Sequence, residues 1–325
     1  MVPKQLILQM KGRLRWKCDA KWWLLTALLI GLMGCFSSPT AEREKWRISL
    51  LRGPSAIAFA GWMEQQARLA GKQLDIELID SPQQMQAALI QQTSDIAVLP
   101  MVSAANLYNK GVRYELVGCP IWGTLYLVGR PTAWDTEEPT IHLFGRGTTP
   151  DLLARHYLEQ RGIRFRPNYS FATASEVAQG LQSGVVALAV LSEPYLSWVL
   201  RQDSTLQVLA DLNQLDGAGE VAFAQTAILL RPGLPIQRQE LDSLLEISCR
   251  FANQQPEAAI ARLEERQFFP PNWMDRNSIQ RCRITYRSAE TASEEIRAFL
   301  ELMLHYEPQA IGNRLPDAAF WGEQP

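Results

Sequence analysis

Hydrophobic and polar positions repeat in two rounds between residues 46 and 214, and each round predicts strands that alternate with helices. The repeat is clearest in one strand, where IAVL at 96–99 matches LAVL at 188–191 after a shift of 92 residues. Each round opens with a short apolar strand that runs into a glycine-containing loop, at 46–51 and at 140–144. Strands and helices in this order predict two similar parallel α/β lobes. The helices are expected at 56–70, 83–92, 150–161 and 175–183.

The remaining apolar segments connect the two lobes and add a helical C-terminus. A long apolar stretch at 114–129 predicts the last strand of the first lobe, followed by a chain crossing near 130–139. A second apolar strand at 221–230 is expected to return to the first lobe. Lobe 1 therefore comprises 46–129 and 221–325, lobe 2 comprises 130–220, and the two crossings imply a hinge beside a cleft. The C-terminal helices are predicted at 237–252, 256–267 and 293–304, with a capping box of Thr291 and Glu294 before the last.

The composition is that of an exported globular protein. The chain has 325 residues, of which 47% are hydrophobic and 20% charged, and this balance excludes disordered, collagen-like and polytopic membrane proteins. The formal net charge of −2 hides an asymmetry, because residues 1–34 carry +5 and the remainder therefore carries −7. The body of the protein has no basic patch and no helix-turn-helix, which argues against nucleic acid as a partner.

Residues 1–34 predict a signal peptide. Thirteen uncharged residues, 22–34, follow the basic segment, and this run is shorter than the roughly 20 apolar residues that span a bilayer. The run ends in Leu-Met-Gly before Cys35, which resembles a bacterial lipobox, so Cys35 is expected to carry lipid (palmitate) and 35–45 to form a tether. An ordinary signal peptide or an uncleaved anchor remains the alternative. Either Met1 or Met10 fits as the start.

The sequence offers little for catalysis or metal binding. The three histidines, at 142, 156 and 305, have no partner at metal-ligand spacing, and no nucleophile elbow or Cys–His arrangement occurs. No metal, no cofactor and no enzymatic activity are therefore expected. Outside the leader and the lipobox, the cysteines are Cys119, Cys249 and Cys282, whose wide spacing favours core thiols while leaving one disulfide open.

Loops at the carboxyl ends of the predicted strands are the candidate walls of a ligand site. In the first lobe these loops are 52–55 and 100–103, from which Ser55, Met101 and Ser103 are candidates. The second lobe offers the loops 145–149 and 192–195. The glycine loop 145–149 before a helix, with Thr149 as the expected N-cap, would present free amides to an anion. Its candidates are Gly147, Thr148 and Thr149, although any strand-to-helix turn needs glycine and a cap without a ligand.

Four further candidates are Trp122, Gly123, Glu193 and Arg281. Trp122 could stack on a ligand while Gly123 offers its backbone, or the indole could simply pack in the hinge. Glu193 is expected to face the cleft, where it would pair with an amine or bridge the lobes, or merely complement the helix dipole. Arg281, in an expected extended segment at 278–286, is a candidate for an anion-directed side chain, with a surface charge as the alternative.

These motifs together resemble an ABC-transporter substrate-binding protein of the nitrate/sulfonate/thiamine-precursor group. The resemblance rests on the lipobox, DIAVLP at 95–100, GRGTTPD at 145–151, VLSEP at 190–194 and IGNRLPDAAF at 311–320. It implies the α/β type II periplasmic-binding-protein fold, two lobes joined by a two-crossing hinge, with a helical C-terminus. It also implies ligand contacts at Ser55, the 101–103 loop, the 147–149 loop and Glu193, whereas Trp122, Gly123 and Arg281 come from the residues alone.

Members of this family capture a solute between two closing lobes. The resemblance therefore implies that this protein delivers its solute to a permease in the cytoplasmic membrane. The expected protein is therefore a monomer, lipid-anchored on the periplasmic or other extracytoplasmic face of a bacterial envelope. The family's inorganic-anion binders use histidine, lysine or acidic clusters that this sequence lacks, so a small organic ligand with an anionic or aromatic part is expected. The alternatives are an enzyme on the same bilobal fold, of the thiamine-pyrimidine or menaquinone-pathway type, and a lipid-anchored sensory module.

Overall fold

The computed structural model describes residues 44–64, 67–213 and 223–322. The expected signal peptide and Cys35 lie outside these residues. Within the described part, none of the helices combines the length and the apolar character that crossing a membrane requires.

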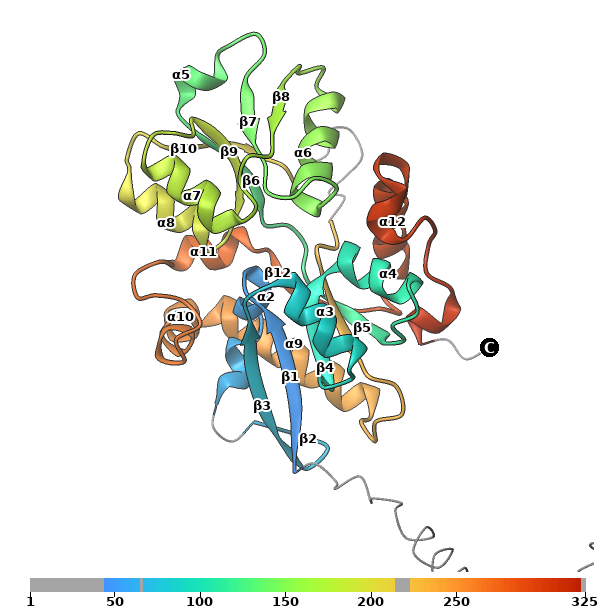
Figure 1. Ribbon diagram of the computed structural model, residues 1–325. Coiled ribbons are helices and arrows are strands. Elements are labelled where there is room, and N and C mark those ends of the chain that lie inside the picture. The colour runs from blue at the N-terminus through green and yellow to red at the C-terminus, as the bar shows by residue number, and fades with distance from the viewer. Residues whose placement is uncertain (1–43, 65–66, 214–222, 323–325) are drawn as a thin grey trace, which may run out of the picture. The chain divides into compact units, whose positions relative to one another are not determined.

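A seven-stranded mixed sheet forms the core of the first lobe (Figure 1). Its strand β1 is parallel to β3 on one side and to the central strand β4 on the other. On the far side of β4, strand β11 runs antiparallel and separates β4 from β5. The order across the sheet is β12 (Ile284–Ser288), β5 (Glu115–Ile121), β11 (Thr226–Leu230), β4 (Ile96–Pro100), β1 (Lys45–Leu51), β3 (Lys72–Ile79) and β2 (Arg68–Leu69).

A five-stranded sheet in the second lobe repeats this arrangement. Its β9–β7–β8 unit is parallel, like β4–β1–β3, and its antiparallel strand β6 lies beside β9 as β11 lies beside β4. The predicted 92-residue repeat is thus confirmed, because β4 and β9 occupy equivalent places. The order is β10 (Gln207–Asp211), β6 (Leu125–Gly129), β9 (Leu188–Ser192), β7 (Thr140–His142) and β8 (Arg166–Asn168).

Helices cover the sheets and form most of the C-terminal part of the described chain (Figure 1). Those before residue 210 are α2 (Pro54–Ile57), α3 (Pro82–Ile90), α4 (Met101–Asn109), α5 (Pro131–Trp134), α6 (Thr149–Gln160), α7 (Ala174–Gln182) and α8 (Tyr195–Gln202). Those after it are α9 (Arg238–Gln254), α10 (Pro256–Glu265), α11 (Arg276–Arg281) and α12 (Ser293–Tyr306). Short 3-10 helices are η1 (Ala60–Met63), η2 (Pro308–Ile311) and η3 (Ala318–Trp321).

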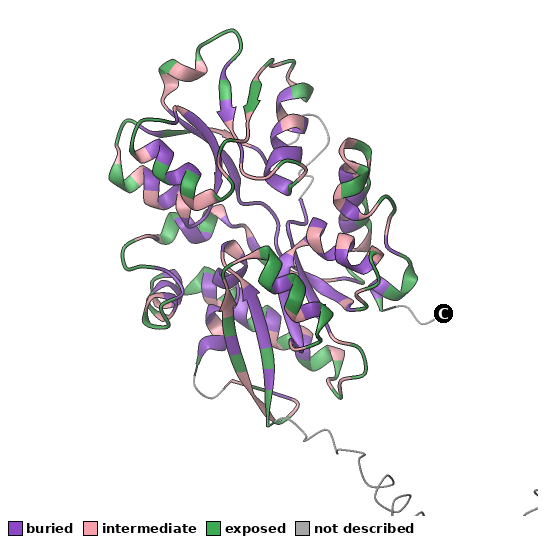
Figure 2. Ribbon diagram, in the orientation of Figure 1, coloured by how far each residue is buried: buried purple, intermediate pink, exposed green. Residues whose placement is uncertain are grey.

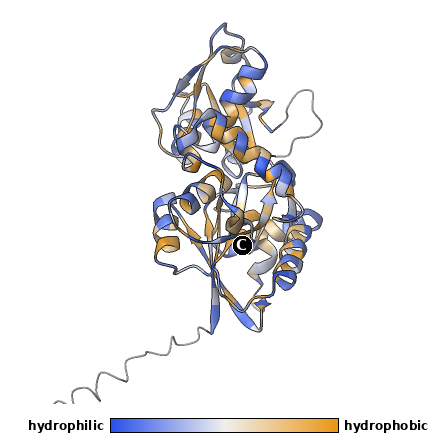
Figure 3. Cartoon of the chain, turned by 90° about the vertical axis from the view of Figure 1, so that its right-hand side faces the viewer, coloured by the Kyte–Doolittle hydropathy of each residue, from blue (hydrophilic) through white to orange (hydrophobic). Residues whose placement is uncertain are grey.

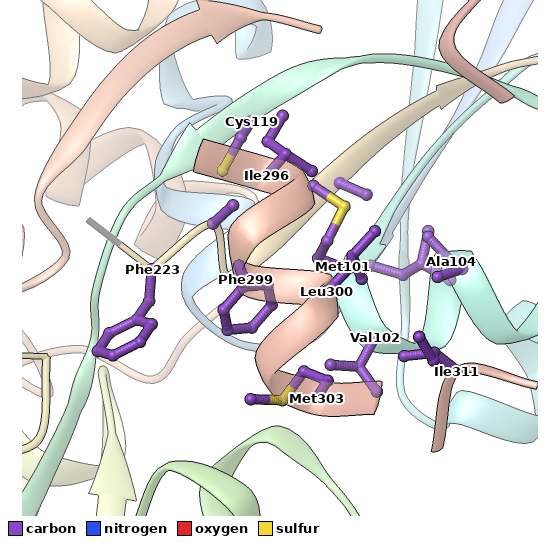
Figure 4. Packing of buried hydrophobic residues seen from close by; sticks show 14 of the residues in the cluster. Met101, Val102, Ala104, Cys119, Phe223, Ile296, Phe299, Leu300, Met303 and Ile311 are labelled. Atoms are coloured by element: carbon purple, nitrogen blue, oxygen red, sulfur yellow. The ribbon is translucent and has the colours of Figure 1, made fainter. Parts of the chain in front are cut away.

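Both faces of the large sheet are buried, which explains why its strands read as continuous apolar runs. Along β4, Ile96 and Val98 pack in one hydrophobic cluster while Ala97 and Leu99 pack in another. The cluster that contains Ala97 and Leu99 also includes residues of α4 and α12 (Figure 4), and it continues into the second lobe. Purple buried segments run along the strands in Figure 2, and Figure 3 shows hydrophilic residues in many of the connecting loops.

The predicted helix at 56–70 is wrong, because a contact distant in sequence interrupts it. Only α2 and η1 form there, followed by strand β2. The carbonyl of Ala58, which would accept from Trp62 in an α-helix, instead accepts the Ser248 hydroxyl of α9 at 2.7 Å. Trp62 then donates to Phe59 in 3-10 fashion. A Cβ on Gly61 would lie 2.8 Å from the Cα of Ser248, so only glycine permits this approach.

The single strand expected at 114–129 is two strands in different sheets. Strand β5 belongs to the first sheet and β6 to the second, so the chain crosses at 122–124 rather than near 130–139. Gly123, with φ 146°, provides the break. The return is as expected, since β11 pairs in the first sheet.

Two smaller expectations also fail for local reasons. The hydroxyl of Thr291 donates back to the Ser288 carbonyl instead of capping α12, whose N-cap is Ala292. The segment 278–286 is not extended throughout, because α11 occupies its first part and β12 its last. The three described cysteines are free and buried, which confirms core thiols over a disulfide.

Candidate ligand-binding site

A cavity of about 540 Å³ lies where strands of both sheets end. Residues at or just after the carboxyl ends of four strands line it: Leu51 of β1, Pro100 of β4, Phe144 after β7 and Ser192 of β9. Residues of all four predicted strand-to-helix loops therefore lie on this cavity.

The first-lobe wall begins with the β1–α2 loop. Gly53 has φ 141°, a conformation that other residues rarely adopt, and its carbonyl accepts from Ala56. This turn places Ser55, which is buried, on the cavity. Arg52 and Asp80 line the same side and form an ion pair of 2.6 Å.

The N-terminus of α4 supplies the rest of that wall. Val102 and Ser103 line the cavity, and no side chain caps this helix, so its first-turn amides after Met101 have no side-chain acceptor. The Met101 amide is used within the protein, since it donates to the Gln225 carbonyl at 2.9 Å. The Met101 side chain does not form part of the wall, because it is fully buried beside Leu300 of α12 (Figure 4).

The β7–α6 loop forms the main second-lobe wall. Gly147, Thr148 and Thr149 all line the cavity, as expected from the sequence. The helix N-cap is Thr148 rather than Thr149, and its hydroxyl donates to the Gly145 carbonyl at 2.6 Å but accepts no hydrogen bond from the amides of the first turn. No side chain caps α6 either, which leaves its first turn open toward the cavity.

Buried Asp151 stabilises this loop from behind. Its carboxylate accepts from the Gly147 amide at 2.8 Å, from Arg155 at 3.1 Å and from the Tyr169 hydroxyl at 2.6 Å. These donors satisfy both oxygens of the Asp151 carboxylate. Arg146 lies over the Tyr169 ring, with its guanidinium 5.0 Å from the ring centroid, and is not part of the cavity lining.

Glu193 and Arg281 form an ion pair with each other. Arg281 donates through Nε to Glu193 and through Nη2 to the Ser197 hydroxyl, and the Glu193 carboxylate also accepts from the Ser197 amide. Burial raises the pKa of Glu193, and the Arg281 charge and the Ser197 bonds oppose that rise. Neither residue lines the cavity. The pair instead joins the end of α11 to the loop between β9 and α8, and Ser197 adds a contact with α8 itself.

Trp122 and Gly123 lie in the crossing between the sheets, outside the cavity lining. The Trp122 indole donates to the Thr285 carbonyl at 2.8 Å, and the Arg287 guanidinium lies over its ring. A Cβ on Gly123 would lie 2.8 Å from the Asn213 side chain. Trp122 is therefore packed in the hinge, which was the alternative interpretation of this residue.

Several residues that line the cavity were not predicted from the sequence. Arg52 and Tyr195 belong to candidate loops but were not selected, and Asp80, Phe144 and Gln225 follow or precede strands. All five lie within three residues of a strand end, and this position is the sequence signal that could have identified them. Within the described ranges, no cluster of three or more histidine, cysteine, aspartate or glutamate residues could hold a metal ion.

Similarity to solved structures was found along most of the chain. An ABC transporter protein from Parabacteroides distasonis is 46% identical over 87% of this chain and 100% of its own, with a TM-score of 0.81. The periplasmic aliphatic sulphonate-binding protein of Escherichia coli is 19% identical over 84% and 92%, with a TM-score of 0.64. The periplasmic nitrate-binding protein of Synechocystis is 11% identical over 86% and 88%, with a TM-score of 0.60. No protein-family model and no curated protein sequence matches the chain.

Proposed function

Because this chain belongs to the substrate-binding proteins of ABC transporters and has their two-lobed type II fold, we propose that it captures a small organic anion for import. The ligand carries an anionic group together with an aliphatic or aromatic part. The protein delivers it as a monomer to a permease in the cytoplasmic membrane, and it catalyses no reaction on the ligand.

The size and lining of the cavity carry this proposal. A volume of about 540 Å³ lies within the range of roughly 300–1,000 Å³ typical of sites for organic ligands, and is generous for an inorganic ion. Apolar side chains such as Leu51, Met85, Leu99 and Phe144 share the lining with hydroxyls and open helix starts. Apolar walls suit a hydrocarbon part, and the amides of α4 and α6 suit an acidic group.

The division of the walls between two sheets supports capture by closure. Ser55 and Ser103 come from the first lobe, and the 147–149 loop comes from the second. A ligand that contacts both walls stabilises the closed arrangement and is removed from water at the same time. Among the described strands, the chain passes from one sheet to the other between β5 and β6 and again between β10 and β11, which suits a hinge.

The N-terminal segment supports a place on the outer face of the cytoplasmic membrane. We propose that the basic and apolar residues 1–34 direct export and that Cys35 receives the lipid anchor. Metabolic labelling with a radioactive fatty acid, compared between the natural protein and Cys35→Ser, tests this anchor. Equal labelling of both would overturn it.

A thermal-shift screen with the purified protein tests the ligand class. The panel contains alkane and aryl sulfonates, aromatic acids, thiamine precursors and amino acids, with nitrate and bicarbonate as inorganic comparisons. A ligand that binds only the folded state raises its melting temperature, by an amount that grows with concentration. We expect organic anions to raise it and nitrate to leave it unchanged. A shift by nitrate alone, or by none of the panel, would overturn the proposed ligand class.

A further inference from the structure

Arg52 is held at the cavity by two partners from the first lobe. Its Nε donates to Asp80 at 2.6 Å and its Nη1 donates to the Phe268 carbonyl at 2.5 Å. Among the described residues, none accepts a hydrogen bond from Nη2 of this guanidinium. The side chain is about one-third exposed and lines the cavity, so the cation is fixed in direction while part of it faces the ligand space.

Tyr195 lies on the second-lobe wall of the same cavity, at the first residue of α8. Burial raises the pKa of this phenol, while the nearby Arg52 charge and a hydrogen bond with Ser175 oppose the rise. The hydroxyl therefore stays protonated at neutral pH and is able to donate a hydrogen bond. Arg52 and Tyr195 therefore line the same cavity, one from each lobe.

One loop, between α10 and α11, contacts both side chains. Its Phe268 carbonyl accepts from Arg52, and its Trp273 ring packs edge-on against Tyr195 with centroids 5.6 Å apart. Trp273 also stacks on Trp198 of α8, at 5.2 Å and 24°. Residues of the loop thus hold a cation from one lobe and a phenol from the other in a defined arrangement.

We propose that Arg52 and Tyr195 form a clamp, one residue from each lobe, that selects the acidic group of the ligand. This inference rests on the proposed function and names the residues that set its charge preference. A guanidinium donates to carboxylate or sulfonate oxygens in a charge-assisted hydrogen bond, and the phenol adds a neutral donor from across the cleft. The ligand's acidic group thereby connects the two lobes when they close.

Asp80 limits the strength of this clamp. Its carboxylate lies against Arg52 and repels a second anion that approaches the same cation. In Asp80→Asn, the amide oxygen still accepts from Arg52 but the negative charge is gone. The clamp therefore predicts that Asp80→Asn binds anions more tightly than the natural protein, whereas a site for an amine would lose affinity.

Calorimetric titration of the full chain tests the clamp. The probes are benzoate, benzenesulfonate, hexanoate and 1-hexanesulfonate, with benzyl alcohol and 1-hexanol as uncharged analogues. We expect Arg52→Met to weaken anion binding about tenfold or more and to leave the alcohols within twofold, because a hydrogen bond to a charged group is worth that factor. Arg52→Lys is expected to retain part of the affinity, and Tyr195→Phe to weaken anion binding about three- to tenfold.

A matched control separates this site from a general loss of positive charge. Arg250→Met removes an exposed arginine of α9 that pairs with Glu246, away from the cavity, and is expected to bind every probe like the natural protein. Thermal unfolding of each variant checks that it is folded. Asp80→Asn provides a second test that does not depend on removing Arg52.

The possible failures are distinguishable. If the natural protein binds anions but Arg52→Met binds them equally well, or Asp80→Asn binds them more weakly, the clamp is wrong and the proposed function stands. If the natural protein binds none of the anionic probes and only uncharged or cationic solutes of the screen bind, both the clamp and the anionic ligand class are overturned.

Discussion

The guanidinium of Arg281 donates to the fully buried carboxylate of Glu193, which lies 88 residues earlier in the chain. This contact joins α11, which follows the last return to the first lobe, to the loop between β9 and α8 of the second lobe. Ser197 and Ser278 extend it through a hydroxyl pair of 2.5 Å. A polar connection of this kind fixes where the two elements meet, because a buried charge without its partner is costly.

Loss of this connection is expected to destabilise the fold and spare the cavity. Arg281→Met leaves Glu193 buried without its cation, so the free energy of unfolding should fall by about 3–5 kcal/mol. Arg276→Met, on the same helix, breaks only the exposed pair with Glu257 and should cost far less, because water screens this pair. Urea unfolding of both variants measures the difference. Equal costs would contradict a structural role for Glu193 and Arg281.

The crossing at Gly123 is expected to tolerate no side chain. Gly123→Ala requires a rare φ and brings the new Cβ to 2.8 Å from Asn213, whereas Gly184→Ala requires a rare φ in open space. The first variant should therefore lose about 1–3 kcal/mol more than the second. Thermal unfolding gives both values. Similar losses would show that Asn213 moves away at little cost.

The three described cysteines are expected to resist thiol reagents. Burial raises the pKa of Cys119 and of Cys249 to about 12, so almost no thiolate forms at pH 8, and the reagent cannot reach the sulfur. Cys282 is fully buried as well. Mass mapping after iodoacetamide treatment should find these positions labelled only in denaturant. Rapid labelling of any of them under native conditions would contradict their burial.

His156 is expected to make stability depend on pH. Burial lowers its pKa below the ordinary 6.5, and its Nδ1 lies 3.1 Å from the Tyr306 hydroxyl of α12. The unfolded chain therefore binds more protons than the folded one at mildly acidic pH, so stability is lost as pH falls below about 6.5. His156→Gln cannot titrate, and its stability deficit should shrink between pH 8 and pH 5.5.

Urea unfolding at several pH values, on the natural protein and the variant, measures this deficit. His142, whose pKa burial also lowers, is present in both proteins and cancels from the difference. A deficit that stays constant across the pH range would mean that His156 contributes packing alone.

Local patterns were sufficient to predict the repeated framework. Strand β4 and strand β9 are short apolar runs between an amphipathic helix and a loop. In each case the helix, the strand and the loop lie within some twenty consecutive residues, so a local pattern is enough to identify them. The loops at their ends then follow from the geometry of α/β sheets, which is why Ser55, Ser103 and the 147–149 loop were placed on the cavity.

The features that could not be predicted from the sequence depend on contacts between segments that are distant in the chain. Whether 114–129 is one strand or two depends on pairing with β11 and β9, more than fifty residues away. The partner of Glu193 lies on a helix that the sequence suggested was extended. Met101 follows a strand end like its neighbours, but only the position of α12 determines that its side chain points into the core (Figure 4).

The insertion of β11 between β4 and β5 has a consequence for the order of assembly. The second sheet uses only residues 125–211, so all its strands are present once that part of the chain has been made. The first sheet cannot join β4 to β5 until residues 226–230 arrive, and β5 gains β12 later still. A chain that emerges N-terminus first therefore completes the sheet of the second lobe while β4 and β5 of the first lobe still lack the strand that joins them.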